Sequence, residues 1–277
     1  MKKQFVKQTL IIALLAVSGL AFSQESVMLK YNFVKGKSYL QNTQISQTIV
    51  QSMGGQQIKI LSDINATNDY QIENVESNGN ASILMSLLNS SVRSAAMGRD
   101  TTMKFNDLKD KIRFVYSPDG KVVSETKVDT SDLTPVLAPI FKTARLQVIP
   151  GREIKVGEKW QDKIKENSNV SRFNTEVNNT LDYTFVGKET KDGKVLGKIT
   201  FTGTLSLNGK GNQMGMEMFL EGTGKTEGFL YFDPKTSIVT YYEGQTEMDM
   251  NIAISGQQNM TIPMTESAKT IMTIQEK

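Results

Sequence analysis

The feature that most constrains the fold is a two-residue alternation in residues 58–72. Even positions carry the apolar residues Ile58, Ile60, Ile64, Ala66, Tyr70 and Ile72, and odd positions carry the polar residues Lys59, Asp63, Asn65, Asp69 and Gln71. Because successive side chains of a β-strand point to opposite faces of a sheet, the pattern predicts one strand with a single apolar face. At ~3.3 Å per residue the segment would extend about 50 Å, so we expect it to bend or coil.

The same alternation recurs in four later segments, which indicates that most of the chain is β-strand. Each of these segments places its apolar side chains on one parity of the numbering. The apolar positions are Leu181, Tyr183 and Phe185; Val195, Ile199, Phe201, Leu205 and Leu207; Met248, Met250, Ile252 and Ile254; and Met260, Ile262 and Met264.

Short turn signals separate these segments. Gly, Asn and Asp tolerate the backbone angles that tight hairpin turns require, so they favour direct connections between antiparallel strands. We therefore predict an all-β fold in which long antiparallel strands follow one another as a meander. The turn signals are Met53-Gly54-Gly55, Asn78-Gly79, Pro118-Asp119-Gly120, Asp192-Gly193, Asp233-Pro234 and Ser255-Gly256.

Residues 131–146 break the alternation and predict one short helix. Thr130, Ser131 and Asp132 are residue types that cap a helix N-terminus, and Pro150 lies beyond its end. The apolar side chains that this helix would present are Val136, Leu137, Ile140 and Phe141. We expect the helix to cover one face or one end of the sheet.

Four landmarks recur at offsets of 113 to 121 residues, which predicts an internal duplication. They pair Gly36 and Tyr39 with Gly157 and Trp160, Asp69-Tyr70 with Asp182-Tyr183, Asn78-Gly79 with Asp192-Gly193, and Tyr116 with Tyr231. The predicted organisation is a signal peptide in residues 1–23, a first β repeat in 24–128, a helical connector in 129–149 and a second β repeat in 150–277. The repeats would form either one curved sheet or two packed β units.

The first 23 residues have the organisation of a cleavable export signal. Lys2, Lys3 and Lys7 precede an apolar run over residues 10–21, and Ser23 closes a short cleavage site. The apolar run is shorter than the roughly twenty residues that span a bilayer. Gln24 stands where a lipoprotein would carry its lipid-anchor cysteine. The sequence therefore predicts a periplasmic or secreted protein that is not membrane-spanning.

Composition excludes several classes of function. The chain contains no histidine and no cysteine, so it lacks the commonest general base, the commonest metal ligand and the most reactive thiol. Removal of residues 1–23 would take away three lysines and reduce the formal charge of +3 to zero. A neutral chain offers no electrostatic attraction to nucleic acid. We predict no cofactor and no nucleic-acid partner.

Two motifs that resemble catalytic signatures do not fit their contexts. Residues 222–226 end like a phosphate-binding loop, but Phe219 stands where that loop needs its first glycine. Ser124 and Lys127 have the spacing of a serine–lysine pair, yet a strand would turn them to opposite faces. No short motif singles out a pair of carboxylates. We therefore predict a non-enzymatic protein with no catalytic residues, although a carboxylate pair formed by the fold stays open.

Methionine is the one compositional excess with a chemical meaning. Met214, Met216 and Met218 would lie on one face of a strand, where thioethers could bind Cu(I) or Ag(I). Leu220 continues the same parity, which favours ordinary core packing, and we predict no metal site. Because methionine is unbranched and adaptable, a sheet face that it lines could also accommodate acyl chains of varied shape.

The export signal, the long strands, the segment Val156-Gly157-Glu158-Lys159-Trp160 and the segment Gly228-Phe229-Leu230-Tyr231-Phe232-Asp233 resemble a group of exported Gram-negative proteins of unknown function. In general shape such chains are also similar to the periplasmic lipoprotein-carrier (Lol-type) fold, in which helices plug the hollow of a curved antiparallel sheet. That similarity concerns architecture only, and the present chain has far less predicted helix. No functional residue follows from either resemblance.

The predicted function is that of an exported binding protein that holds a hydrophobic or lipid-like small molecule on an apolar sheet face. The candidate ligand-binding residues are Tyr183, Phe185, Phe201, Met214, Met216 and Met218. The alternative is an envelope structural or interaction module whose partner is an envelope protein, with exposed strands that pair by edge addition. Cu(I) or Ag(I) binding by methionine is the third hypothesis.

Overall fold

The computed structural model describes residues 25–130, 138–170, 173–213, 216–255 and 259–277. The predicted signal peptide and Met214 lie outside the described residues. Among the residues that the structure describes, no helix combines the length and the apolarity needed to cross a membrane.

Strands make up most of the described chain, so the predicted all-β class is confirmed. One short helix, α1 (Ala138–Thr143), interrupts them. The strands are β1 (Ser26–Leu29), β2 (Ser38–Met53), β3 (Gln56–Val75), β4 (Ala81–Ala96), β5 (Arg99–Asn106), β6 (Lys111–Tyr116), β7 (Val122–Asp129), β8 (Arg152–Lys155), β9 (Lys159–Val170), β10 (Phe173–Lys191), β11 (Lys194–Gln213), β12 (Met216–Asp233), β13 (Ile238–Ser255) and β14 (Met260–Glu276).

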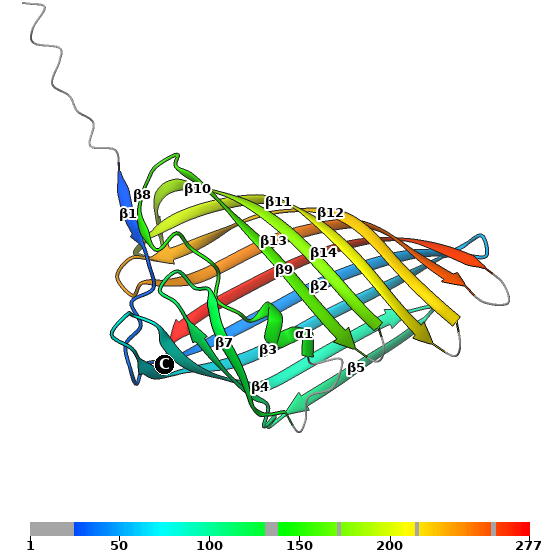
Figure 1. Cartoon of the computed structure of the whole chain (residues 1–277), viewed down its shortest axis with the longest axis horizontal. Coiled ribbons are helices and arrows are strands. Elements are labelled where there is room, and N and C mark those ends of the chain that lie inside the picture. Colours follow the sequence, from blue (N-terminus) through cyan, green and yellow to red (C-terminus); the bar gives the residue numbers. More distant parts are fainter. Residues whose placement is uncertain (1–24, 131–137, 171–172, 214–215, 256–258) are drawn as a thin grey trace, which may run out of the picture.

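Twelve strands form one continuous, strongly twisted sheet (Figure 1). The order is β7-β6-β4-β3-β2-β14-β13-β12-β11-β10-β9, and β5 pairs with the outer part of β4. All neighbours are antiparallel, and the pairing of β14 with β2 joins the two halves of the chain. Of the two predicted arrangements, one curved sheet is therefore the observed one. A separate two-stranded sheet joins β1 to β8.

The alternation in β3 has the predicted effect. Ala66, Tyr70 and Ile72 are buried, whereas Lys59 and Gln71 on the opposite parity are exposed. We call the face with the buried side chains the inner face and the opposite face the outer face. The pattern fails at the start of β11, where Val195 is 47% exposed, because this residue lies beside the turn that connects β10 to β11.

The core lies on the inner face in two clusters. One contains Tyr70, Met85 and Phe114 and is covered by Ile140 and Phe141 of α1. The other contains Tyr183, Phe185 and Phe201, among other side chains, and is covered by Val27 and Leu29 of β1, Tyr31, Ile149, and Ile154 of β8. Phe33, Leu146 and Ile238 contact both clusters. The N-terminal segment and the connector therefore fill the space above one end of the sheet.

The predicted connecting helix is present but short. α1 has six residues, Ile140 and Phe141 are buried as expected, and the helix ends well before Pro150. The predicted capping residues Ser131 and Asp132 lie outside the described residues, as do Val136 and Leu137.

Tight turns connect most neighbouring strands. Gly54 and Gly55 join β2 to β3 with φ angles of 59° and 79°, and Asp192 and Gly193 join β10 to β11 with φ angles of 50° and 72°. Positive φ at both central positions is the geometry of hairpin turns that match the twist of the strands. The β4–β5 hairpin at Met97, with φ 52°, was not predicted.

The two edge strands of the sheet, β7 and β9, approach each other at Arg145. The Arg145 Nη2 atom is 2.8 Å from Glu125 Oε2 on β7, and Nη1 is 3.2 Å from Glu166 Oε1 on β9. The guanidinium carbon also lies 5.7 Å from the centre of the Phe114 ring. The sheet thus curls far enough at this end for one side chain of the connector to contact both of its edges.

The two halves share a local backbone arrangement. The Gly36 N–H donates to the Ile72 carbonyl at 2.9 Å, and the Gly157 N–H donates to the Phe185 carbonyl at 2.8 Å. These glycines precede β2 and β9, which occupy corresponding places in the two predicted repeats. The duplication and its boundaries stay a prediction.

Candidate functional site

The three aromatic residues of the predicted ligand site belong to the filled core. Tyr183, Phe185 and Phe201 are 2%, 0% and 3% exposed. The Tyr183 ring stacks on Trp160 with centroids 5.3 Å apart, and the Phe201 ring stacks on Tyr242, also at 5.3 Å. An apolar cavity between Tyr31, Phe33 and the neighbouring core side chains has a volume of only about 20 Å³. These aromatic side chains therefore pack against the protein itself.

The structure does not bring the predicted methionines to the aromatic residues. Met216 is 38% exposed and Met218 is half-buried, and both lie near the far end of β12. Phe201 is the cross-strand partner of Gly228, ten positions from Met218 along the same strand. At ~3.3 Å per residue this separation is roughly 33 Å. The predicted residues therefore do not form one site.

The inner face continues beyond the core as an apolar surface. Its side chains come from β2, β3 and β10 to β14, and they are half-buried except for Met250, which is 6% exposed. We call this surface the distal inner face. It comprises Ile49, Ile58, Ile60, Val177, Leu205, Leu207, Met218, Leu220, Met248, Met250, Ile252, Ile254, Ile262 and Met264.

Strand register arranges these side chains in transverse rows. Met250 is the cross-strand partner of Met264 on one side and of Gly222 on the other. In the next row, Ile252 lies between Ile262 and Leu220. Direct cross-strand neighbours on one face are close enough for their side chains to touch. The distal inner face is therefore a continuous apolar layer and not a set of scattered residues.

Two glycines give the methionines room. A Cβ atom on Gly222 would lie 2.7 Å from Met250 Cγ, and a Cβ atom on Gly224 would lie 2.5 Å from Met248 Cγ. The methionine side chains thus lie across glycine positions of the neighbouring strand. Since methionine has three rotatable bonds, such side chains can change shape when a ligand binds.

Neither core cluster includes a residue of the distal inner face. In the part of the chain that the structure describes, the covering segments that carry Val27, Ile140 and Ile149 pack on the core end of the sheet. Contiguous apolar surface of this kind marks sites for hydrophobic ligands or for other proteins.

One carboxylate lies among these apolar side chains. Glu266 is the cross-strand partner of Ile49 on β2 and of Met248 on β13, and it is half-buried. It forms no ion pair with another described residue. This side chain is therefore available to a polar group of a bound molecule.

A buried polar network lies within the core end of the inner face. The Tyr70 hydroxyl donates to Gln41 Oε1 at 2.8 Å, and the Gln41 amide donates to the Ala144 carbonyl at 3.2 Å. Asn68 also donates to Gln41 Oε1, at 3.3 Å. Burial raises the pKa of the Tyr70 phenol well above its ordinary value, so this group stays a neutral donor. The network fixes the segment after α1 to the sheet.

The geometry shows no ligand set for a metal ion among the described acidic residues, since no group of three or more of them converges. The cross-strand partners of Met218 are Gly211 and Ile254, and that of Met216 is Gln213. The methionine pair that the register does bring together is Met250 with Met264. Binding of Cu(I) or Ag(I) stays a hypothesis.

Sequence reasoning recognised the alternation of Met248, Met250, Ile252 and Met264 but did not select these residues as a site. The sequence signal for this site was a pair of glycines, Gly222 and Gly224. They stand on β12 at positions where the alternation would place apolar side chains, and their cross-strand partners on β13 are Met250 and Met248. Which part of each long strand is covered depends on contacts with β1, α1 and β8, and those are not local in sequence.

No protein-family model matches the chain, and no curated protein matches it. Similar solved structures include an outer membrane channel from Pseudomonas putida F1, with 7% identity over 86% of this chain and 96% of that chain and a TM-score of 0.23. Pseudomonas aeruginosa OpdQ has 8% identity over 86% and 99% of the two chains, with a TM-score of 0.24. The translocator domain of the autotransporter NalP from Neisseria meningitidis has 10% identity over 87% and 89%, with a TM-score of 0.21. These TM-scores are too low to support an inference about architecture or function.

Proposed function

We propose that the protein is an exported, non-enzymatic binding protein that holds a hydrophobic or lipid-like molecule on the distal inner face. The observation that supports this function is the continuous layer of methionine, isoleucine and leucine side chains beyond the filled core. We therefore propose the site at Met248, Met250, Ile252 and Met264 in place of Tyr183, Phe185 and Phe201, which pack in the core.

Burial alone can supply the affinity. Each methylene group that moves from water to an apolar surface contributes roughly 0.8 kcal/mol, so an acyl chain of about ten carbons needs few polar contacts. Met248 and Met250 lie over glycines and can adjust to chains of different shape. This chemistry favours a class of apolar ligands over a single compound.

Glu266 determines which polar group the site prefers at the end of the ligand. Its carboxylate accepts hydrogen bonds and repels another carboxylate, and it lies next to Met248. An alcohol or an amine at the head of the acyl chain therefore suits this position better than a fatty acid does. The preferred ligand is a neutral or cationic amphiphile.

Probe binding to the protein purified after export tests the proposal. Dodecylamine, dodecanol and dodecanoate compete with a fluorescent apolar probe, N-phenyl-1-naphthylamine, and the first two are expected to bind more tightly than dodecanoate. Ile252→Asp places a charge in the apolar layer and is expected to abolish probe binding. Asn251→Asp is the matched control, because Asn251 is exposed on the outer face of the same strand.

Circular dichroism of both variants shows whether the sheet is retained. Absence of probe binding to the unmodified protein contradicts the proposal, and so does equal binding by Ile252→Asp and Asn251→Asp. Glu266→Gln is expected to remove the difference between dodecylamine and dodecanoate. Organic extracts of protein from the cell envelope, analysed by mass spectrometry, would identify the natural ligand.

A second candidate function is an envelope interaction module, and the edge strand β7 favours it. β7 pairs only with β6 in the described sheet, and its Val122, Val123 and Val128 are 38%, 58% and 46% exposed. An exposed edge of this kind can accept a strand from another protein. Crosslinking in cells from position 123 would yield a dominant protein adduct under this alternative, while crosslinking from position 252 would not.

A further inference from the structure

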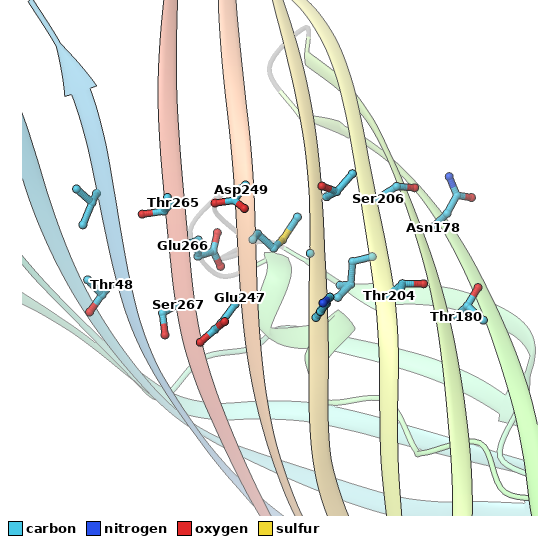
Figure 2. A pocket seen from close by; sticks show the side chains of 16 residues that line it. Thr48, Asn178, Thr180, Thr204, Ser206, Glu247, Asp249, Thr265, Glu266 and Ser267 are labelled. Atoms are coloured by element: carbon cyan, nitrogen blue, oxygen red, sulfur yellow. The ribbon is translucent and has the colours of Figure 1, made fainter.

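A broad hollow lies mainly on the outer face, and the inner-face residues Leu205, Met248 and Glu266 also contribute to its lining. Its volume is about 880 Å³, and it crosses six neighbouring strands from β2 to β10 (Figure 2). Five strand spacings of ~4.8 Å give it a length of about 24 Å. We call this hollow the transverse trough. It runs across the strands.

Two register rows of small polar side chains form its floor. Thr204 pairs with Lys225 and Thr180, and one row further along the strands Thr223 pairs with Asp249 and Ser206. Figure 2 shows Thr204, Ser206, Glu247, Asp249, Thr265 and Ser267 spread over β11, β13 and β14. Most positions therefore carry a hydroxyl, an amide or a carboxylate at the spacing of the strands.

Several polar side chains of this floor form no hydrogen bond or ion pair with other described residues. Among the described residues, the hydroxyls of Thr204, Thr223 and Thr265 make no hydrogen bond with other protein groups, and neither Lys225 nor Glu247 forms an ion pair although they are cross-strand partners. Nearby on the outer face, Lys269 and Glu243 form an ion pair at 2.7 Å. The trough thus presents donors and acceptors side by side without partners.

A second hollow of about 670 Å³ continues the trough towards β9. It begins one row beyond Asn178 and Ser206, at Glu176 and Asn208, and it contains Phe219. The Phe219 ring is 37% exposed on the outer face, and Lys210 Nζ lies 5.2 Å from its centre. An exposed aromatic ring beside polar side chains offers a flat apolar surface to a ligand that is otherwise hydrophilic.

We propose that the transverse trough binds an extended, neutral glycan chain that lies across the strands and stacks one sugar on Phe219. Hydroxyl, amide and carboxylate groups together match the mixed donors and acceptors of sugar hydroxyls. The length of the trough favours an extended glycan chain over a single sugar. Glu247 and Asp249 outnumber Lys225 in the trough, which disfavours polyanions such as sulfated or phosphorylated polymers. The floor of the trough and the proposed hydrophobic site lie on opposite faces of the same strands.

Calorimetric titration of the exported protein with cellohexaose, mannohexaose and isomaltohexaose tests the inference. At least one of these neutral hexasaccharides is expected to bind with a Kd below about 1 mM, and glucose, mannose and a heparin hexasaccharide are expected to bind far more weakly. A triple variant, Thr204→Val with Thr223→Val and Thr265→Val, keeps the strand preference and removes three hydroxyls. It is expected to weaken binding about tenfold or more.

Thr102→Val on β5 is the matched control, because it removes an exposed hydroxyl outside the trough. Phe219→Ala is expected to weaken the hexasaccharide and to leave the fold intact. The inference is overturned if none of the three neutral hexasaccharides binds, if the triple variant binds as well as Thr102→Val, or if heparin binds more tightly than all of them. None of these results bears on dodecylamine binding to the distal inner face.

Discussion

The Trp160 indole lies flat against the Tyr183 ring, with centroids 5.3 Å apart and planes 8° from parallel. The two residues are direct cross-strand partners on β9 and β10, and Tyr39 and Tyr70 are partners at the corresponding place on β2 and β3. Aromatic pairs of this kind contribute more than their buried area alone. In this protein they serve the core, although the sequence pattern also made Tyr183 a ligand-binding candidate.

Replacement of Tyr183 by leucine is expected to lower the free energy of unfolding by about 2 to 4 kcal/mol, because it removes a buried ring and the stack on Trp160. The chain has one tryptophan, so urea unfolding followed by Trp160 fluorescence measures the loss directly. Tyr183→Phe retains the ring and is expected to cost much less. An equal loss for both variants would mean that the hydroxyl, and not the stack, stabilises this position.

Gly120 is expected to be intolerant of substitution. Its φ angle is +83°, and a Cβ atom there would lie 2.5 Å from the Gln147 carbonyl oxygen and 2.8 Å from Tyr31. Gly120→Ala should therefore cost about 2 to 4 kcal/mol, measured by thermal or urea unfolding. Gly98→Ala is the control, because Gly98 has a φ of +77° but no atom within 4 Å of the added carbon, and its cost should be about 1 kcal/mol. Equal costs would show that the contact with Gln147 is unimportant.

Arg145→Met is expected to loosen both edges of the sheet together. The guanidinium contacts Glu125 on β7 and Glu166 on β9, and these side chains are partly exposed, so the loss of stability should be only about 1 kcal/mol. Amide hydrogen exchange should nevertheless increase in β7 and β9 at the same time. Arg93→Met removes a comparable pair of contacts to Asp63 and Asp100 within β3 to β5 and should leave β7 and β9 unchanged. An increase confined to one edge would contradict a shared role for Arg145.

Alkaline pH is expected to unfold the protein through its buried tyrosines. Burial raises the pKa of the Tyr242 phenol from 10.0 to about 12, and it raises the pKa values of Tyr31 and Tyr183 further. Because the folded-state pKa exceeds the unfolded one, this stabilisation is complete below pH 10 and is lost as the pH rises from 10 towards 12.

The free energy of unfolding by urea, measured at a series of pH values, checks this prediction. It should fall steeply above pH 10, and Tyr242→Phe should reduce the steepness. With no histidine in the chain, stability should change little near neutral pH. A free energy of unfolding that stays constant between pH 10 and 12 would contradict the buried, neutral state of these phenols.

Local sequence determined the class of the fold and most of its connections. The parity of Ala66, Tyr70 and Ile72 marked the inner face of β3, because the side-chain period of a strand is two and needs no knowledge of the partner strand. The turns at Gly54 and Asp192 were equally local, since they depend on residues that tolerate positive φ. The length of α1 and the exposure of Val195 were not local, because both depend on where the covering segments end.

Only the tertiary structure decided which stretch of each apolar strand face is core and which is left uncovered by the segments that the structure describes. The pairing of β14 with β2, the pairing of β1 with β8 and the position of Arg145 between two sheet edges join residues far apart in the chain. The alternation of apolar and polar side chains is the same around Phe201 and around Met250. Phe201 packs beneath a covering segment, whereas Met250 lies beyond the covering segments that the structure describes. The sequence alone therefore predicted an apolar face, and long-range packing located the distal inner face.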